Sequence, residues 1–280
     1  MDVAVQQAFD LQLSSGSMHA LSRGPSTGFP ALCVPGLSAN ARSFDAIAAR
    51  LAGRGRRVVA VDLRGRGFSP PTGAGTYGWR RHAQDVLEAA RLCGFDSFDL
   101  LGHSMGAFVS MEAAAIDPGR IRRLVLIDAA GVPEPAAIPP IRAAIERLGA
   151  VFPSPEAYCE AIRKIGAAVP WDLWGPHYLY DLEEVPGGVR SRTSREAVFE
   201  DAAYGATHDA SATWKALRMP TLLVRAARTL SPEGGFIVGA QLRDAFLAAV
   251  PSARAIDVDA NHYGVMADPD ALRAIEEFVG

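Results

Sequence analysis

The stretch of sequence that decides the fold is Gly102-His103-Ser104-Met105-Gly106. A mainly apolar run, residues 98–101, precedes it, and a run of small residues with helical character, residues 107–115, follows it. The order strand, Gly-x-Ser-x-Gly, helix predicts a sharp turn that presents the Ser104 hydroxyl at the end of a strand. Because a free serine hydroxyl is a weak nucleophile, such a site also needs a base and hydrogen-bond donors for an oxyanion.

The composition is that of a globular protein with a large core. The chain has 280 residues, 49% of them hydrophobic, and a net charge of −3, which does not favour nucleic acid as a partner. Cys33, Cys93 and Cys159 form neither a disulfide framework nor a close-spaced metal motif, and we expect Cys33 and Cys93 to be core thiols. No segment approaches the roughly 20 apolar residues of a membrane span, and the first residues lack a basic signal-like region. We therefore expect a cytoplasmic protein with a small-molecule substrate; the sequence does not distinguish a monomer from a homodimer.

We call the turn at residues 102–106 the elbow. Short apolar runs alternate with helical patterns on both sides of it, which predicts an α/β fold with a doubly wound, mostly parallel eight-stranded sheet. The alternation stops over residues 131–218, where Pro, Ala and aromatic residues accompany helical pieces with no clear strand. We expect this insertion, which we call the lid, to interrupt a core domain of residues 1–130 and 219–280. The expected strands are 8–13, 17–22, 30–34, 57–63, 98–103, 121–128, 221–225 and 253–258, and the expected core helices are 44–51, 79–93 (apolar face Val86, Leu87, Ala90, Leu92), 107–115, 234–248 and 269–279.

A base for Ser104 is expected at His262, which lies just past the last predicted strand. The carboxyl ends of parallel strands meet at one edge of a sheet, so Ser104 and His262 would lie together there. Two backbone N–H groups are expected to form the oxyanion hole, that of Met105 after the nucleophile and that of Leu37 in the loop after an early strand, where Gly36 permits a tight turn. Structural or surface roles are expected for the remaining histidines, His19, His82, His103, His177 and His208.

Taken together, these motifs resemble the α/β-hydrolase fold. The resemblance covers the oxyanion loop at 34–38, a turn at 62–69 after the next strand, the elbow, a lid and a late histidine. It implies a serine hydrolase that needs no cofactor and no metal. One departure is Pro35-Gly36, where the family usually has His-Gly: the backbone donor stays, but a side chain that often braces the loop is absent.

The second departure concerns the acid of the triad. The family usually places it after the strand that follows the lid, and here Arg228, which cannot accept the imidazole N–H, occupies that position. Asp128, at the end of the strand after the elbow helix, is the favoured replacement, because some dehalogenases and lactonases of the family use that position. Glu233, five residues after Arg228, is the alternative, and Asp128 would then be a structural strand-end residue.

We expect a carboxylic ester hydrolase that works through an acyl-enzyme. An apolar, aromatic entrance is expected, with Trp171, Trp174 and Tyr178 of the lid and Val265 near the base as candidate substrate-binding residues for a small to medium, partly hydrophobic substrate. The formal match of Gly73, Gly75 and Gly78 to a dinucleotide fingerprint carries little weight, because it follows Pro70-Pro71 instead of a strand.

Other functions of the same fold stay open. The serine nucleophile argues against the Asp-dependent dehalogenases and epoxide hydrolases. A lactonase, a hydrolase of carbon–carbon bonds, and a ligand receptor that retains a slow triad are the alternatives. A carboxylesterase is expected first, a lactonase next and a carbon–carbon hydrolase third. The identity of the substrate, and whether the acid is Asp128 or Glu233, are left open by the sequence.

Overall fold

A single eight-stranded sheet forms the centre of this computed structural model, which describes residues 6–230 and 234–280. The strand order is β1-β2-β4-β3-β5-β6-β9-β10. β1 and β2 pair antiparallel at one edge, β2 is antiparallel to β4, and the strands from β4 to β10 pair in parallel. The predicted doubly wound, mostly parallel sheet is confirmed. The strands are β1 (Gln7–Leu13), β2 (Gly16–Arg23), β3 (Pro30–Val34), β4 (Arg57–Val61), β5 (Phe98–His103), β6 (Ile121–Ile127), β9 (Thr221–Ala226) and β10 (Ala253–Val258).

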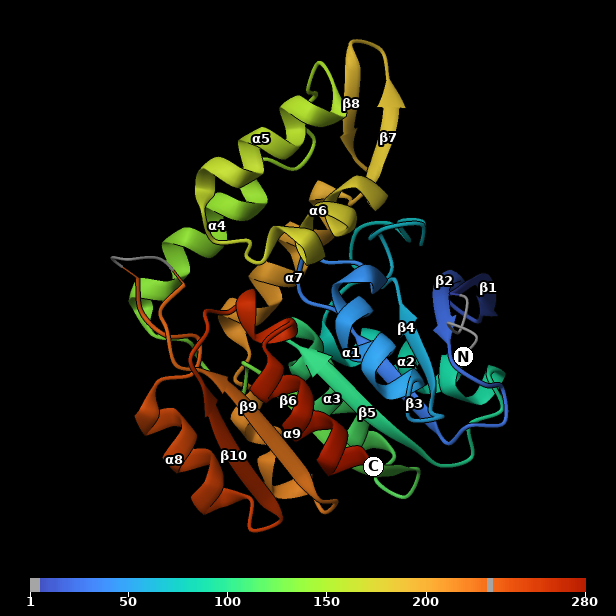
Figure 1. The fold of residues 1–280 in the computed structure, drawn as a ribbon, viewed down its shortest axis with the longest axis vertical. Coiled ribbons are helices and arrows are strands. Elements are labelled where there is room, and N and C mark those ends of the chain that lie inside the picture. Colours follow the sequence, from blue (N-terminus) through green and yellow to red (C-terminus); the bar gives the residue numbers. More distant parts are fainter. Residues whose placement is uncertain (1–5, 231–233) are drawn as a thin grey trace.

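Helices cover both faces of this sheet (Figure 1). α1 (Asp45–Ala52) and α9 (Pro269–Val279) pack on one face, and α2 (Trp79–Leu92), α3 (Met105–Ile116) and α8 (Ala240–Ala249) on the other. Successive strand residues point to opposite faces, so each central strand contributes to both cores. In β3, for example, Leu32 and Val34 join the α2–α3 side, and Ala31 and Cys33 join the α1–α9 side. Burial on both faces explains why these strands read as continuous apolar runs.

Two details of the core differ from the sequence prediction. Leu92 was expected on the apolar face of its helix, but it is the last residue of α2 and is 40% exposed, whereas Val86, Leu87 and Ala90 are buried. The helix expected from residue 234 begins at Ala240. The preceding loop is instead held by Glu134, whose carboxylate accepts the Phe236 N–H at 2.9 Å, and Gly235 packs against the same side chain.

The lid contains α4 (Ile138–Glu146), α5 (Pro155–Ile165), α6 (Trp171–Tyr180) and α7 (Arg195–Thr207). α4, α5 and α6 lie in the upper part of the molecule in Figure 1, and α7 lies lower, beside the core. The expectation of no strand here is wrong, because β7 (Leu182–Val185) and β8 (Gly188–Ser191) form an antiparallel hairpin. Each strand has four residues and mixed polarity, so neither shows the apolar run of a buried strand. Among the described residues, no helix is long and apolar enough to cross a membrane.

Candidate active site

Ser104 occupies the sharp turn between β5 and α3. Its backbone has φ 56° and ψ −126°, a combination that residues with a Cβ rarely adopt, and its N–H donates to the Ile127 carbonyl at 3.0 Å. The side chain is half-buried, so its hydroxyl stays reachable. The fold therefore holds a strained backbone at the residue where the sequence predicts a nucleophile, which is where such strain is commonly found.

Close backbone packing surrounds this turn. A Cβ added to Gly106 would lie 2.0 Å from the Val34 carbonyl oxygen, and one added to Gly36 would lie 3.1 Å from the Ser104 Cβ. Glycine at both positions thus lets the loop after β3 approach the serine. Within residues 6–230 and 234–280, neither the Leu37 N–H nor the Met105 N–H donates to a protein acceptor. Both donors of the predicted oxyanion hole are available to a ligand.

His262 and Asp128 form a hydrogen-bonded pair. The His262 Nδ1 lies 2.8 Å from the Asp128 Oδ2, and both side chains are buried. The other carboxylate oxygen of Asp128 accepts the Ala226 N–H at 3.0 Å, and the Asp128 N–H donates to the Val224 carbonyl at 2.7 Å. Asp128 also has a positive φ of 47°, which turns its side chain across the end of β9. An acceptor at Nδ1 keeps the proton there and leaves Nε2 as the basic nitrogen.

The other candidate positions for the acid are placed differently. Arg228 makes a two-pronged ion pair with Asp259, with both N–O distances 2.6 Å, and both side chains are largely exposed. Glu233 lies outside the described residues. In the described part of the chain, the carboxylate that contacts His262 is that of Asp128.

His103, inside the elbow, supports the loop that carries His262. Its Nε2 lies 3.0 Å from the His262 carbonyl oxygen, so Nε2 must carry the proton and donate it. The two imidazole rings lie 4.5 Å apart between centroids. Burial lowers the pKa of His103 well below its usual value, so it stays neutral and keeps this tautomer. This contact brings the loop after β10 directly against the elbow.

The lid contacts the same loop on both sides of His262. The Asn261 side chain donates to the Ala167 carbonyl at 3.0 Å, and its oxygen accepts the N–H groups of Tyr263 and Gly264. The Trp174 indole N–H donates to the Tyr263 carbonyl at 3.3 Å. The position of the lid and the position of the histidine are therefore linked through hydrogen bonds.

The predicted substrate-binding residues make packing contacts in this structure. Trp174 and Tyr178 are buried, and Trp171 stacks on Tyr178 with ring centroids 6.1 Å apart. Val265 is fully buried in the turn after His262. These four side chains join the lid to the loop that carries His262. Their role in substrate binding stays a prediction.

Arg147, which follows α4 in the lid, was not among the residues predicted from the sequence. Its guanidinium donates to the Tyr158 hydroxyl at 2.9 Å and lies 5.4 Å from the centre of the Tyr178 ring. The side chain is half-buried, and none of the described carboxylates forms an ion pair with it. Arg147 also acts on Tyr263, the residue after His262. Burial raises the pKa of Tyr263, and the positive charge of Arg147 offsets part of that rise.

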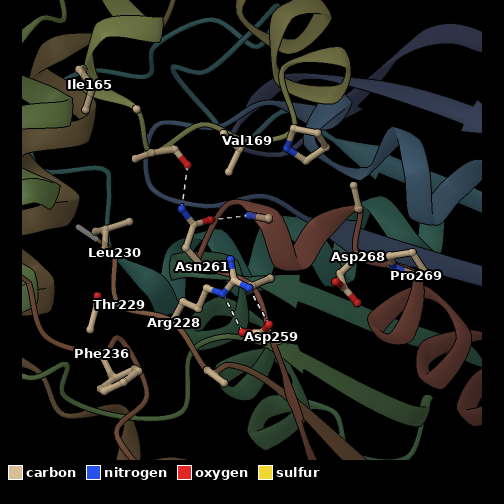
Figure 2. Close-up of a pocket in the computed structure, with 17 residues that line it drawn as sticks. Ile165, Val169, Arg228, Thr229, Leu230, Phe236, Asp259, Asn261, Asp268 and Pro269 are labelled. Atoms are coloured by element: carbon tan, nitrogen blue, oxygen red, sulfur yellow. Dashed lines mark hydrogen bonds and ion pairs between the residues drawn. The ribbon is translucent and has the colours of Figure 1, made fainter. Parts of the chain in front are cut away.

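An open groove of about 900 Å³ lies beside the loop that follows β10. Figure 2 shows the residues that line it. Its walls are formed by lid residues 165–167, 169 and 170, residues 227–230, Phe236, residues 259–261, and residues 264 and 267–269. It contains the Arg228–Asp259 pair and Asn261. Ser104, Asp128 and His262 do not line it, so we do not assign the reaction to this groove. Over the described ranges, no three His, Cys, Asp or Glu side chains are grouped so that they could hold a metal ion.

Comparison with known proteins agrees with the fold. A family model described as the alpha/beta hydrolase fold matches residues 30–154, which include the loop after β3, the elbow and Asp128. The chain has the α/β-hydrolase fold. A solved structure of E-2-(acetamidomethylene)succinate hydrolase superposes on this α/β-hydrolase with a TM-score of 0.88 over 98% of this chain and 99% of that chain, at 24% identity. The predicted resemblance is confirmed.

Two curated relatives are also similar in sequence. The 2-(acetamidomethylene)succinate hydrolase of Mesorhizobium japonicum is 26% identical over 99% of this chain and 98% of its own length. The N-formylmaleamate deformylase of Pseudomonas putida is 39% identical over 36% of this chain. The chain spans only 28% to 53% of the lengths of three curated relatives, the deformylase among them at 37%.

Proposed function

We propose that this α/β-hydrolase cleaves an acyl bond, a carboxylic ester or an N-acyl bond, in a small substrate that carries a carboxylate group. Two observations support the proposal: the His262–Asp128 hydrogen bond in the loop packed against the elbow, and Arg147, a lid cation that lacks a carboxylate partner among the described residues. The proposal keeps the ester hydrolysis expected from the sequence and adds that the substrate carries a negative charge.

In the proposed reaction, each group has one role. The Ser104 Oγ attacks the substrate carbonyl while the His262 Nε2 takes its proton, and the Leu37 and Met105 N–H groups stabilise the oxyanion. His262 then gives the proton to the leaving alcohol or amine, and the acyl group stays on Ser104. Water attacks the acyl-enzyme with its proton going to His262, and the acid product leaves with the serine hydroxyl restored. Asp128 holds His262 in the required tautomer and stabilises the imidazolium.

The charge argument rests on what surrounds Arg147. A guanidinium has five N–H donors. The described contacts of Arg147 are a hydrogen bond to the Tyr158 hydroxyl and cation–π contacts with the rings of Tyr158 and Tyr178. The nearby carboxylate is Asp181, which is bound instead by the Thr193 and Ser191 hydroxyls, and burial raises the pKa of Asp181 to about 6. Arg147 therefore has donors to offer to a planar anion, which guanidinium groups bind in a two-pronged manner.

The names of the relatives agree with this class. One is a hydrolase of an acetamidomethylene succinate and the other a deformylase of an N-formylated maleamate, so both names contain an N-acyl group and a carboxylic acid. The aromatic side chains of Trp171, Trp174 and Tyr178, with Val265, would then border the apolar part of the substrate.

The test compares matched esters. Mono-p-nitrophenyl esters of four- to six-carbon dicarboxylic acids are assayed beside their methyl-capped neutral counterparts, with the uncatalysed rates subtracted. We expect the wild type to prefer the charged ester in kcat/KM by at least about 10-fold, and Arg147→Gln to remove the preference while keeping turnover of the neutral ester. Arg163→Gln, an exposed lid arginine with the same charge change, is the control.

Two results would contradict the proposal. Equal turnover of charged and neutral esters by the wild type would make it a simple esterase. A preference that survives Arg147→Gln would show that another group binds the carboxylate, leaving Arg147 as part of the lid core.

A further inference from the structure

A fully buried arginine, Arg66, connects the oxyanion loop to the lid. It belongs to the turn after β4, and its side chain is 0% exposed. The Nε donates to the Leu37 carbonyl at 3.0 Å, one Nη donates to the Arg64 carbonyl at 2.9 Å, and the other contacts the Asp201 Oδ2 at 2.6 Å. One rigid guanidinium thus connects Leu37, whose N–H is a predicted donor of the oxyanion hole, to helix α7.

Asp201 is the lid end of this connection, and it is itself buried and fully engaged. Its Oδ1 accepts the Gly78 N–H at 2.6 Å, and its Oδ2 also faces the His82 Nε2 at 2.8 Å. Burial alone would raise the pKa of Asp201, but the His82 hydrogen bond and the Arg66 charge hold the pKa below its usual value. Asp201 is therefore a charged partner for Arg66.

Helix α7 is fixed to the core by a second acidic side chain. The Glu200 carboxylate accepts the Gly75 N–H at 2.8 Å and the Tyr77 N–H at 3.0 Å. The glycine-rich segment 73–78, which formally matches a dinucleotide fingerprint, therefore directs its N–H groups to carboxylates of α7. These contacts fix where α7 lies, and through Asp201 they fix Arg66.

Two other contacts hold the loop around Leu37. The Gly36 carbonyl, in the same peptide plane as the Leu37 N–H, accepts the Ala39 N–H at 3.2 Å, and the half-buried Leu37 side chain packs against the core. Pro35 and Gly36 carry no polar side chain. The Leu37 carbonyl lies in the next peptide group, so the contact with Arg66 restricts the ψ of Leu37 and with it the direction in which the loop presents the Leu37 N–H.

We propose that Arg66 and Asp201 form a positioning pair that holds the Leu37 N–H in place for the oxyanion and makes the oxyanion hole depend on the seating of α7. This inference rests on the proposed acyl-transfer function. Arg66 acts through Leu37 and does not touch the reacting atoms, so it is a positioning residue.

The expected effect is on kcat. Loss of one oxyanion donor commonly costs about 100- to 1,000-fold in kcat, and a displaced donor retains part of its effect. We expect Arg66→Gln and Asp201→Asn each to lower kcat by about 10- to 100-fold with KM changed less than about threefold. The double variant should lose no more than the more severe single variant, because the two residues act as one unit.

The chain offers a matched control in the same turn. Arg64 forms a buried pair with Asp85, with 2.7 Å between Nε and Oδ2, and also binds the Thr76 carbonyl, but it does not contact the oxyanion loop. Arg64→Gln and Asp85→Asn remove a comparable buried ion pair, so they report the general cost in stability. Urea unfolding of all four variants measures that cost.

The decisive readout is the rate at which an uncharged fluorophosphonate modifies Ser104, since this reaction needs the oxyanion hole but no carboxylate on the reagent. We expect Arg66→Gln and Asp201→Asn to slow it at least 10-fold relative to Arg64→Gln and Asp85→Asn at equal folded fraction. Equal slowing by both pairs would overturn the inference and make Arg66 a structural residue. If the wild type is modified but hydrolyses no charged ester, the substrate class fails while this comparison still decides the role of Arg66; absence of modification in the wild type would overturn both.

Discussion

Replacement of Asp128 by Asn tests the arrangement of the triad at its least conventional position. Asparagine is nearly the same size and tolerates the positive φ of 47° at this residue, so we expect the variant to fold. The change removes one of two acceptors, since the carboxylate now accepts from both His262 and the Ala226 N–H. An Asn side chain has one acceptor and one donor end, so it can satisfy only one of these two groups.

Both orientations of Asn damage the site. If its NH2 faces His262, the imidazole must accept at Nδ1 and carry its proton on Nε2, where it cannot take the Ser104 proton. If its oxygen faces His262, the NH2 is directed at the Ala226 N–H, and a buried donor is left unsatisfied at about 1–3 kcal/mol. Wrong tautomer and lost imidazolium stabilisation together predict a fall in kcat of about 10⁴-fold, or about 5.4 kcal/mol of barrier.

The assay is steady-state hydrolysis of a p-nitrophenyl ester by the wild type, Asp128→Asn and Glu233→Gln, with folded fractions checked by urea unfolding. We expect KM to change little in Asp128→Asn, because the acid does not contact the substrate. A crippled Glu233→Gln beside an active Asp128→Asn would refute the reasoning and assign the acid to Glu233.

Three further outcomes follow from local geometry. Ser104→Gly should abolish turnover yet raise the free energy of unfolding by about 1 kcal/mol, because glycine relieves the strained backbone; an unchanged or lower stability in urea would contradict the strain. Gly106→Ala should destabilise by about 3 kcal/mol or more, since its Cβ meets a backbone oxygen, whereas Gly119→Ala, which meets nothing closer than 4.0 Å, should stay within about 0.5 kcal/mol; similar values for the two would contradict the close approach. Burial raises the pKa of Asp181 from 3.8 to about 6 in the folded state, so the folded state binds a proton that the unfolded state has lost, and the free energy of unfolding falls as pH rises from about 4 to 6. Asp181→Asn should remove this fall, which amounts to at most about 3 kcal/mol. A pH profile of stability identical to that of the wild type would contradict the assignment.

The sequence was sufficient for the sheet and the elbow because their signals are local. The apolar run at 30–34 coincides with β3, since buried parallel strands need apolar residues on both faces. The run at 253–258 coincides with β10, an edge strand that is only partly buried and in which Arg254 and Asp257 alternate with apolar residues. The hairpin β7–β8 lacked that signal, because strands of four residues with mixed polarity resemble a loop. The helix expected from residue 234 began late for a tertiary reason, the hold of Glu134 on the Phe236 N–H.

Long-range contacts of single charged residues were not predictable in the same way. Arg66 and Asp201 are separated by 135 residues, and neither stands in a motif that marks a partner. Arg147 likewise appeared as one of many arginines, and only its surroundings of phenols distinguish it from a solvated cation. Asp128 could be predicted from the sequence because it ends a recognisable strand, and because Arg228, at the usual position of the acid, cannot accept the imidazole N–H.

Detection of the acyl-enzyme is the most direct measurement of the chemistry proposed for this site. The enzyme is quenched in acid during turnover of a p-nitrophenyl ester, and the intact protein and its peptides are weighed for the wild type and for Ser104→Ala. We expect a wild-type adduct with the mass of the acyl group on the peptide that contains Ser104, and neither adduct nor turnover in Ser104→Ala. Turnover that persists in Ser104→Ala, or an adduct on another residue, would contradict nucleophilic catalysis by Ser104.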